Sequence, residues 1–418
     1  MKKVLIIGPV LTRSGYGEHA RFVVDALSGD PELDLYIHPL RWGESSWVSG
    51  DITKRAYYDS LIRKTSEFSG TYDLSLQVTV PNEWSKAATI NIGVTAGVET
   101  DKLINDWLPV SNEMDKIIVT SKHIQELFEK SHYTVQNQFS GEPVSFKGTT
   151  TPVEVVTYPV KKVKPIDLSN QINLDTEFNF LTVGQIAPRK NLFASIEWFI
   201  EEFRNENVGL VVKSHMRNTS TPDGLAVEHL LKQVCHNSGE RQCKVYLVKG
   251  CMSEDEVHGL YTHPKIKCIV STTHGEGFGL PLYEAAYCGL PVVAPAWSGQ
   301  KDFLYMPVKN KAGKTKIEAQ FEKVGFDIKE VAADAVMEGI ITPDMKWCYP
   351  QKDKFQKALR RIYTSYSLAE KRASGLQDYL CDRFSLENQH KAMRDAVKNT
   401  YQNDQQDWSE WINRVQEV

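Results

Sequence analysis

The sequence predicts an α/β protein made of two doubly wound domains, each built on a largely parallel sheet. Short apolar runs typical of buried strands alternate with longer stretches typical of helices, and this alternation favours parallel sheets covered by helices. A run rich in Lys, Pro and Asp at residues 159–173 divides the alternation into two series and is the expected linker. The 418 residues suffice for two complete cores.

Composition narrows the class of protein. With 41% hydrophobic and 24% charged residues the chain is ordinary for a globular protein. A net charge of −4 gives no overall basic field to recruit nucleic acid or acidic membranes, although a local patch could still do so. No stretch approaches the roughly 18 apolar residues of a membrane span, so any membrane contact is expected to be peripheral. The apolar run after the N-terminal lysines, about seven residues long, predicts a first core strand rather than a signal peptide.

The seven cysteines predict reduced thiols and a cytoplasmic location. Their number is odd and no two form a C-x-x-C pair. The spacings of Cys235, Cys243 and Cys251 with His229 and His236 do not match zinc-ligand patterns, and no metal is expected.

The first domain is expected over residues 1–165, joined by a C-terminal helix at about 395–418, whose predicted apolar face carries Trp408, Trp411 and Val415. Its predicted strands are 4–7, 35–38, 73–79, 90–95, 116–120 and 153–157. Glu99, Thr100 and Asp101 follow one of these strands and should lie at the carboxyl edge of the sheet, where ligands bind. Residues 136–151 predict a surface loop or hairpin and are a candidate contact for an acceptor.

A glycine pair near the N-terminus leaves a nicotinamide-dependent oxidoreductase open as an alternative. Gly15-Tyr16-Gly17 lies in an expected loop, 9–17, before an expected helix, 18–27, and formally fits the dinucleotide fingerprint G-x-G-x-x-A. The pair, however, lies eight residues past its strand, and no acidic residue ends the following strand, 35–38. The fingerprint is therefore weakly supported.

The second domain is expected over residues 166–394, with strands at 178–183, 208–213, 244–248 and 267–271. Arg189 and Lys190 stand between a strand end and the helix 192–204, a position suited to phosphate oxygens. Ser253 and Glu256 form a capping box that opens a helix ending at Tyr261. A basic stretch, 309–323, is expected to be a solvated excursion or else a contact for an anionic acceptor; its lysines are Lys309, Lys311, Lys314, Lys316 and Lys323.

The most informative stretch is HGEGFGLPLYEAAYCGLPVVAP, residues 274–295. Gly277 and Gly279 allow positive φ and close approach of a ligand, and the helix that follows offers its N-terminus to a phosphate. Glu276 and Glu284 flank that N-terminus, and since carboxylates repel phosphate they suit hydroxyl groups on either side of it. A diphosphate between two hydroxyl-rich groups is a nucleotide sugar. Pro281 suits the first turn, and Cys288-Gly289 should end the helix before a short strand, 291–294.

This stretch, E-G-F-G-L-P-x-x-E-A with seven residues between the carboxylates, resembles the donor-binding signature of the retaining glycosyltransferases of family 4. The resemblance implies the GT-B fold, in which two Rossmann-like domains face a central cleft. It also implies that Glu276 contacts sugar hydroxyls and Glu284 the ribose. Backbone amides of the residues between them would meet the diphosphate and sugar: Gly277, Phe278, Gly279 and Leu280.

The resemblance assigns further roles. Gly15 and Gly17 would donate N–H groups to the diphosphate from across the cleft, and Glu99 would lie near the reacting sugar. The family pattern G-R-x-x-x-x-K-G aligns with Gly184 and Lys190, so Lys190 inherits the diphosphate role. Gln185 stands where the family has Arg, and Arg189 is the candidate substitute. Loop 249–253 would form the nucleobase pocket.

The function implied by the resemblance is transfer of a sugar, with retained configuration, from a nucleoside diphosphate sugar to an acceptor hydroxyl, without a metal or a further cofactor. A glycan is the expected acceptor, and a modified nucleic-acid base is the alternative. A non-catalytic protein that only binds nucleotide sugars is a second rival reading, alongside the oxidoreductase. The sequence predicts no oligomeric state.

Overall fold

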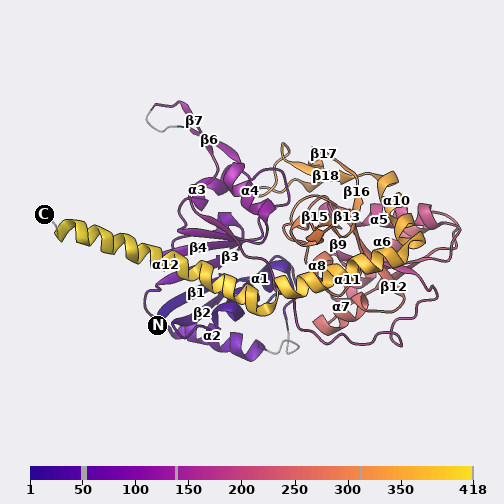
Figure 1. Cartoon of the computed structure of the whole chain (residues 1–418), viewed down its shortest axis with the longest axis horizontal. Coiled ribbons are helices and arrows are strands. Elements are labelled where there is room, and N and C mark those ends of the chain that lie inside the picture. The colour runs from indigo at the N-terminus through magenta and orange to yellow at the C-terminus, as the bar shows by residue number, and fades with distance from the viewer. Residues whose placement is uncertain (49–53, 137–139, 311–312, 417–418) are drawn as a thin grey trace. The chain divides into compact units, whose positions relative to one another are not determined.

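The computed structural model describes residues 1–48, 54–136, 140–310 and 313–416; for residue 135 and residues 403–416 it describes the backbone alone. The chain forms two compact units (Figure 1). The first comprises Met1–Val98, Lys102–Pro159 and Leu386–Val418, and the second comprises Glu99–Asp101 and Val160–Ser385. The sequence predicted domain boundaries after residues 165 and 394. In the structure the first unit ends at Pro159 and resumes at Leu386, and Glu99 is grouped with the second unit.

The first unit is built on a six-stranded parallel sheet with the order β2-β1-β3-β4-β5-β8. Its apolar strands are buried by helices, as the predicted doubly wound sheet requires. The strands are β1 (Lys2–Gly8), β2 (Leu33–Pro39), β3 (Leu74–Val78), β4 (Ile90–Thr95), β5 (Lys116–Val119) and β8 (Val153–Val155). The helices are α1 (Gly15–Leu27), α2 (Arg55–Glu67), η1 (Pro81–Glu83), α3 (Trp107–Ser111), α4 (Lys122–Lys130) and α12 (Leu386–Gln416).

Helix α1 begins earlier than the sequence predicted. Ser14 is its N-cap, with a side-chain oxygen that accepts the Gly17 N–H at 2.9 Å, so Gly15 and Gly17 belong to the first helical turn rather than to a loop. The expected start at residue 18 was wrong because two glycines argue against a helix by propensity, whereas the serine cap stabilises the turn that contains them.

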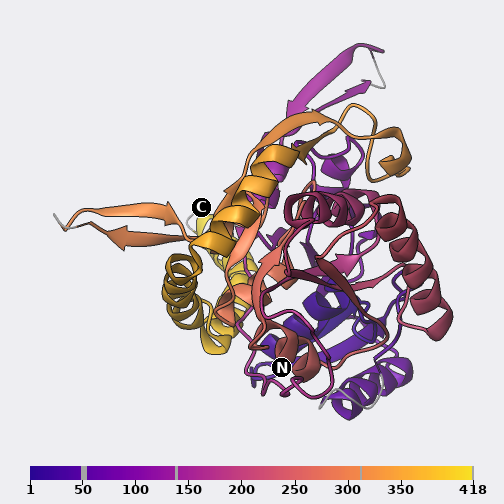
Figure 2. The ribbon, with the colours of Figure 1, turned by 90° about the vertical axis from the view of Figure 1, so that its right-hand side faces the viewer.

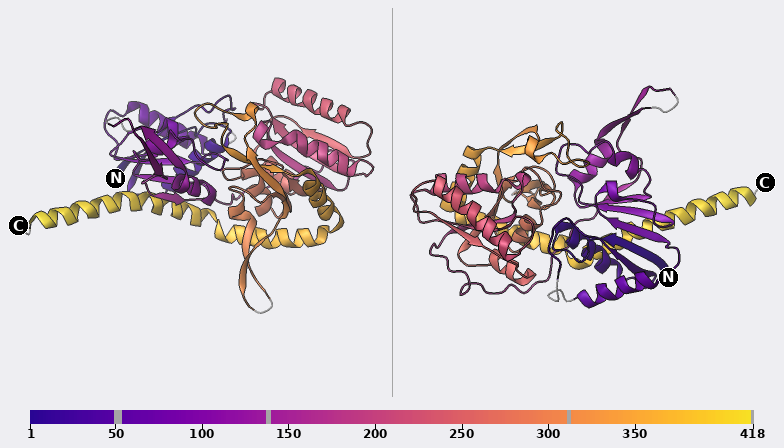
Figure 3. Two further views of the ribbon diagram at one scale, coloured as in Figure 1. Left: turned by 90° about the horizontal axis from the view of Figure 1, so that it is seen from above. Right: turned by 180° about the vertical axis from the view of Figure 1, so that it is seen from behind.

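Helix α12 packs on α1 and completes the core of the first unit with Met393, Ala396 and Val397 (Figures 1 and 3). Charged side chains also hold the helix in place. The Lys116 ammonium donates to the Ala396 carbonyl at 3.0 Å, and Lys398 lies 2.8 Å from Asp30. The side chains of Trp408, Trp411 and Val415, the predicted apolar face, lie outside the described residues.

The second unit has its own six-stranded parallel sheet, with the order β11-β10-β9-β12-β13-β16. This arrangement confirms the predicted fold of two Rossmann-like sheets. The strands of this sheet are β9 (Asn179–Gln185), β10 (Gly209–His215), β11 (Lys244–Val248), β12 (Ile266–Val270), β13 (Val292–Pro295) and β16 (Glu322–Val324). The helices are η2 (Pro188–Lys190), α5 (Leu192–Phe203), α6 (Thr221–Asn237), α7 (Glu254–Tyr261), α8 (Leu280–Tyr287), α9 (Lys301–Leu304), η3 (Ala333–Ala335), α10 (Lys352–Thr364) and α11 (Tyr366–Arg383).

Within the described residues, three antiparallel strand pairs lie outside the two large sheets. The pair β6 (His132–Gln136) and β7 (Pro143–Lys147) extends from the first unit (Figure 1), where the sequence predicted a surface loop or hairpin. The strands β14 (Tyr305–Lys309) and β15 (Thr315–Ala319) form a hairpin that projects from the second unit (Figure 2). The basic stretch 309–323 begins at the last residue of β14 and includes β15, but its last lysine, Lys323, lies in β16 of the large sheet; Lys311 lies outside the described residues. The third pair is β17 (Phe326–Glu330) with β18 (Lys346–Pro350).

Candidate functional site

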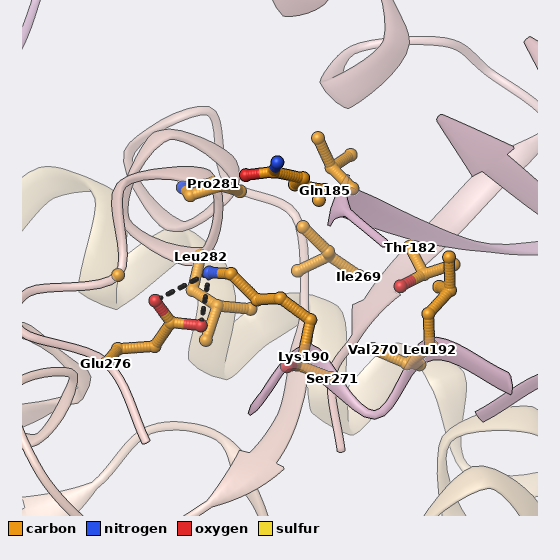
Figure 4. A pocket seen from close by; sticks show the side chains of 13 residues that line it. Thr182, Gln185, Lys190, Leu192, Ile269, Val270, Ser271, Glu276, Pro281 and Leu282 are labelled. Carbon is orange, nitrogen blue, oxygen red and sulfur yellow. Dashed lines mark hydrogen bonds and ion pairs between the residues drawn. The ribbon is translucent and has the colours of Figure 1, made fainter. Parts of the chain in front are cut away.

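A pocket opens at the carboxyl edge of the second sheet, where the strand order reverses. From β9 the chain builds β10 and β11 on one side and then returns to β12 and β13 on the other, and ligands of doubly wound sheets bind at such a switch point. The ends of β9 and β12 form one wall, and the first turn of α8 forms another (Figure 4). Charged and glycine residues of the predicted motifs also line the pocket, namely Gly184, Lys190, Glu276 and Gly279.

The N-terminus of α8 is shaped for close approach of a ligand. Gly279 is its N-cap and has a φ of 102°, a conformation that L side chains rarely adopt. Pro281 and Leu282 in the first turn line the pocket (Figure 4), and the unpaired N–H groups of a first turn favour an anion. Gly289, with a φ of 80°, ends the helix as predicted. The predicted turn, helix and stop are therefore confirmed, although of the two motif glycines only Gly279 has positive φ.

The centre of the pocket is an ion pair between Glu276 and Lys190. The Lys190 Nζ lies 2.7 Å from Oε1 and 2.8 Å from Oε2 of Glu276 (Figure 4). The side chains are only 9% and 20% exposed. Burial by itself raises the pKa of the Glu276 carboxyl, but Lys190 and Arg189 outweigh it and bring that pKa down to about 2. Glu276 is therefore an anion at neutral pH and can only accept hydrogen bonds.

Local backbone contacts fix Lys190 in this place. The turn η2 ends at Asn191, which has a left-handed φ of 50° and caps α5. The hydroxyl of Thr272 donates to the Asn191 carbonyl at 2.9 Å, and the His274 N–H donates to the Arg189 carbonyl at 2.8 Å. These bonds join η2 to the loop after β12, which explains why two sequence motifs 86 residues apart meet in one site.

Arg189 turns toward the same carboxylate instead of toward solvent. Its Nη1 donates to the Gly275 carbonyl at 2.5 Å and to Glu276 Oε2 at 3.3 Å, and its Nη2 lies 3.1 Å from Glu99 Oε1. The side chain is 24% exposed. Glu99, Arg189, Glu276 and Lys190 thus form one chain of alternating charges, and the structure brings together the four charged residues that the resemblance places at the sugar and the diphosphate.

Gln185 does not take the place of the missing cation. It lies at the end of β9 and lines the pocket, but its amide donates to the Met216 carbonyl at 2.6 Å. A neutral amide held by the backbone adds no positive charge to the pocket. The cations described at this site are therefore Lys190 and Arg189.

The other residues predicted to bind the donor from this motif are Phe278, Leu280 and Glu284, before and along α8. The side chain of Phe278 is 4% exposed and packs against Tyr283 and Phe303, with ring centroids 5.0 Å apart in both pairs, so only its backbone is placed for a ligand. Leu280 is the first residue of α8. Glu284 lies further along α8, where its Oε2 accepts a hydrogen bond from the Tyr261 hydroxyl at 3.2 Å.

Gly15 and Gly17 belong to the first unit, at the N-terminus of α1. A Cβ on Gly17 would lie 2.1 Å from the Thr12 carbonyl oxygen, whereas a Cβ on Gly15 would meet nothing within 4 Å. Packing alone therefore requires glycine at position 17, and position 15 is open. Between these glycines, in the first turn of α1, the Tyr16 hydroxyl lies 2.8 Å from that of Thr95, and the Tyr16 ring stacks on Trp42.

Three polar residues that sequence reasoning missed shape the loop around Glu276. The Ser298 hydroxyl accepts the Glu276 N–H at 2.9 Å, and Ser298 itself has a φ of 62°. Gln300 is fully buried and lies 3.1 Å from the Ser298 hydroxyl. His274 Nδ1 lies 2.7 Å from the Cys348 carbonyl, and burial lowers the pKa of the ring. No spacing in the sequence marks Ser298 or Gln300, because the backbone groups that they contact, the Glu276 N–H and the Pro295 carbonyl, are brought to them by the fold.

No group of three or more His, Cys, Asp or Glu side chains within the described residues is arranged to hold a metal ion. No helix in the part of the chain that the structure describes combines the length and apolar character needed to cross a membrane.

Comparison with known proteins relates the site to one family of enzymes. Residues 166–311, which include the whole pocket, match the family model described as glycosyl transferases group 1. No curated protein gives a significant match.

Several solved structures are similar along almost the whole chain. Sucrose-phosphate synthase from Thermosynechococcus elongatus has a TM-score of 0.60 at 15% identity, covering 96% of this chain and 100% of its own. HepE from Anabaena, solved with UDP-glucose, has a TM-score of 0.59 at 13% identity, with the same coverage. A glycosyltransferase from Rickettsia africae has a TM-score of 0.55 at 12% identity, covering 96% and 99%. These similarities show the GT-B fold, and the family match over residues 166–311 supports a glycosyltransferase.

Proposed function

We propose that this glycosyltransferase moves a sugar from a nucleoside diphosphate sugar to a hydroxyl of a glycan, with retained anomeric configuration. One observation carries the proposal: the Lys190 ammonium and the N-terminus of α8 line the same pocket as the ionised Glu276. A cation and a helix N-terminus suit a diphosphate, and an adjacent carboxylate that only accepts hydrogen bonds suits the hydroxyls of the attached sugar.

The leaving diphosphate is stabilised in this proposal by positive charge that is already in place. Negative charge develops on the diphosphate as the bond to the sugar breaks, and preorganised cations and N–H groups are most effective against it in a site with little water. Lys190 exchanges part of its contact with Glu276 for phosphate oxygens. Arg189 takes over the role of the arginine that Gln185 replaces, and Glu99 holds Arg189 by its Nη2. No metal ion is required by this arrangement.

Glu276 orients the sugar and does not attack it. The carboxylate is already engaged by two cations, which makes it a weak nucleophile and a firm anchor for hydroxyl groups. In the proposed retaining reaction the acceptor hydroxyl approaches from the face that the diphosphate leaves, and the departing phosphate receives the hydroxyl proton. Glu284 contacts the ribose, and loop 249–253 holds the nucleobase.

The donor is tested first. The protein is incubated with UDP-, GDP-, ADP- and TDP-sugars, and the thermal shift is measured for each; UDP-glucose, the ligand solved with HepE, heads the panel. The best binder is then offered with a panel of glycan acceptors and with DNA that contains hydroxymethylated bases. Transfer to a glycan is the expected result.

The anomeric configuration of the product, read by NMR, tests retention, and an inverted product would contradict it. Binding without turnover of any donor would favour a protein that only binds nucleotide sugars. A chelator added to the active mixture should leave the rate unchanged.

A further inference from the structure

A buried lysine outside the pocket makes an unusual contact with the backbone. Lys213 lies in β10, where it pairs with Val183 of β9 and Val248 of β11, and the residue is only 8% exposed. Its Nζ donates a hydrogen bond to the Gly250 carbonyl at 2.6 Å. The lysine therefore reaches from a central strand to the loop that follows the neighbouring strand, at the carboxyl edge of the sheet that forms the pocket.

Burying this ammonium costs hydration free energy, so the stability of the sheet does not explain it. Burial lowers the pKa of Lys213, against the opposing influence of Cys251 and Glu256, which shows that the charged form loses hydration there. An apolar side chain of similar length would fill the same space without that cost, and such replacements of buried charges are often neutral or stabilising. The hydrogen bond to the Gly250 carbonyl explains why a lysine stands at this position, whereas packing does not.

The bond fixes the direction of one peptide group. The Gly250–Cys251 peptide is trans, so its C=O and N–H point in opposite directions. Because the Gly250 oxygen points to Lys213, the Cys251 N–H points away from it. Gly250 has a φ of 84°, and a Cβ there would meet nothing within 4 Å, so the glycine serves this backbone conformation and not close packing.

The rest of the loop is held at both ends. Lys249 lies 2.6 Å from Glu228 of α6. At the other end, Ser253 and Glu256 form the capping box that begins α7. Between these two points the bond from Lys213 fixes Gly250, the loop residue whose backbone is least restricted.

We propose that Lys213 is a positioning residue that fixes loop 249–253 so that its backbone recognises the nucleobase of the donor. This inference rests on the proposed function, which places the base on this loop. Lys213 acts through the Gly250 carbonyl and touches neither the sugar nor the diphosphate. Replacing Lys213 should therefore lower the affinity for ligands that contain a base and leave the affinity for pyrophosphate unchanged.

The test is Lys213→Met, which keeps an unbranched side chain one atom shorter and removes the N–H donors. Affinity for UDP, GDP and ADP is measured by calorimetry, with inorganic pyrophosphate as the probe without a base. The nucleoside diphosphate that binds wild type best should lose about tenfold in affinity, and its preference over the other two should shrink. Pyrophosphate should change less than about twofold, KM for the donor should rise with kcat nearly constant, and Lys213→Arg should restore part of the affinity.

Lys265→Met is the matched control. Lys265 also donates to a backbone carbonyl, that of Leu174 at 3.0 Å, but it directly precedes β12, at the opposite edge of the same sheet. Its removal should leave all nucleotide affinities unchanged. The melting temperature of Lys213→Met should equal or exceed that of wild type, since a buried charge is removed.

Two outcomes overturn the inference in different ways. If wild type binds none of the nucleoside diphosphates, the proposed function and this inference fall together. If wild type binds one of them and Lys213→Met binds it equally well, or loses pyrophosphate to the same extent, only the role of Lys213 is wrong. If Lys213→Met unfolds, Lys213→Arg decides: a partial loss of affinity for the nucleoside diphosphate with pyrophosphate affinity unchanged supports the bond to Gly250, and an equal loss for both ligands contradicts it.

Discussion

Replacing Glu276 by Gln removes the negative charge on which two buried cations depend. Gln has nearly the same shape and can still accept a hydrogen bond from Lys190, so the variant isolates the charge. The pKa of Glu276 lies at about 2 against an ordinary 4.5, which corresponds to about 3 kcal/mol of folding stability at neutral pH. The free energy of unfolding of Glu276→Gln, measured by urea titration, should therefore be lower than that of wild type by about this amount. The rate of sugar transfer should fall at least a hundredfold, because the sugar hydroxyls lose the carboxylate that orients them.

The sign of the pH dependence follows from the lowered pKa. A carboxyl whose pKa is lower in the folded protein contributes fully above pH 4.5, and this contribution is lost as the pH falls toward 2. The free energy of unfolding of wild type minus that of Glu276→Gln should therefore shrink by about 1 kcal/mol between pH 7 and pH 4. Urea titrations at pH 7, 5 and 4 measure this difference directly.

Glu228→Gln is the matched control. The pKa of Glu228 is also lowered to about 2, by Lys232 and Lys249, but these pairs are open to solvent. Its replacement should cost little stability, and added salt should remove the effect. If Glu276→Gln were as stable as wild type at pH 7, or if the difference between them did not change down to pH 4, the buried ion pair would not be the source of stability described here.

Three smaller predictions concern the backbone around the pocket and the ribose contact. Ser298→Ala and Ser298→Gly both lose the hydroxyl that accepts the Glu276 N–H, but at a φ of 62° the Gly variant should be about 1 kcal/mol more stable in urea titrations; equal stabilities would exclude backbone strain. Gly279→Ala has room for its Cβ, 3.5 Å from the nearest atom, yet should unfold about 1–2 kcal/mol more easily because of the positive φ, an effect that would be absent if the loop simply relaxed. Glu284→Gln should raise the Kd for the donor nucleotide about tenfold while kcat changes little; a fall in kcat at constant Kd would place Glu284 at the reaction instead of the ribose.

Much of this protein is encoded in local sequence patterns. The alternation of buried strands and helices predicted two parallel sheets. It could be recognised because hydrophobic periodicity and helix caps are set by residues close together in the sequence. The turn and helix from Glu276 to Gly289 were predictable for the same reason: Gly279 and Gly289 permit the positive φ found at the two ends of the helix, and Pro281 has a fixed φ that suits a first turn. The start of α1 was missed because Gly15 and Gly17 disfavour a helix locally, while the cap from Ser14 and the packing of Gly17 against Thr12 favour it.

The directions of side chains were decided by tertiary structure alone. Sequence placed Arg189 beside Lys190 but could not show that the guanidinium turns to Glu276 and Glu99, since those carboxylates come from segments distant in the chain. It placed Phe278 in the binding motif, and the fold buries that ring among other aromatics.

The contacts of Ser298 and Lys213 with backbone groups leave no pattern in the sequence at all. A hydrogen bond to a carbonyl or an N–H depends on where the chain passes, whatever residue stands there. The sequence thus determined which chemical groups this protein brings to its pocket, and only the tertiary structure decided which of them face one another, because charges and hydrogen bonds act through space over a few ångströms.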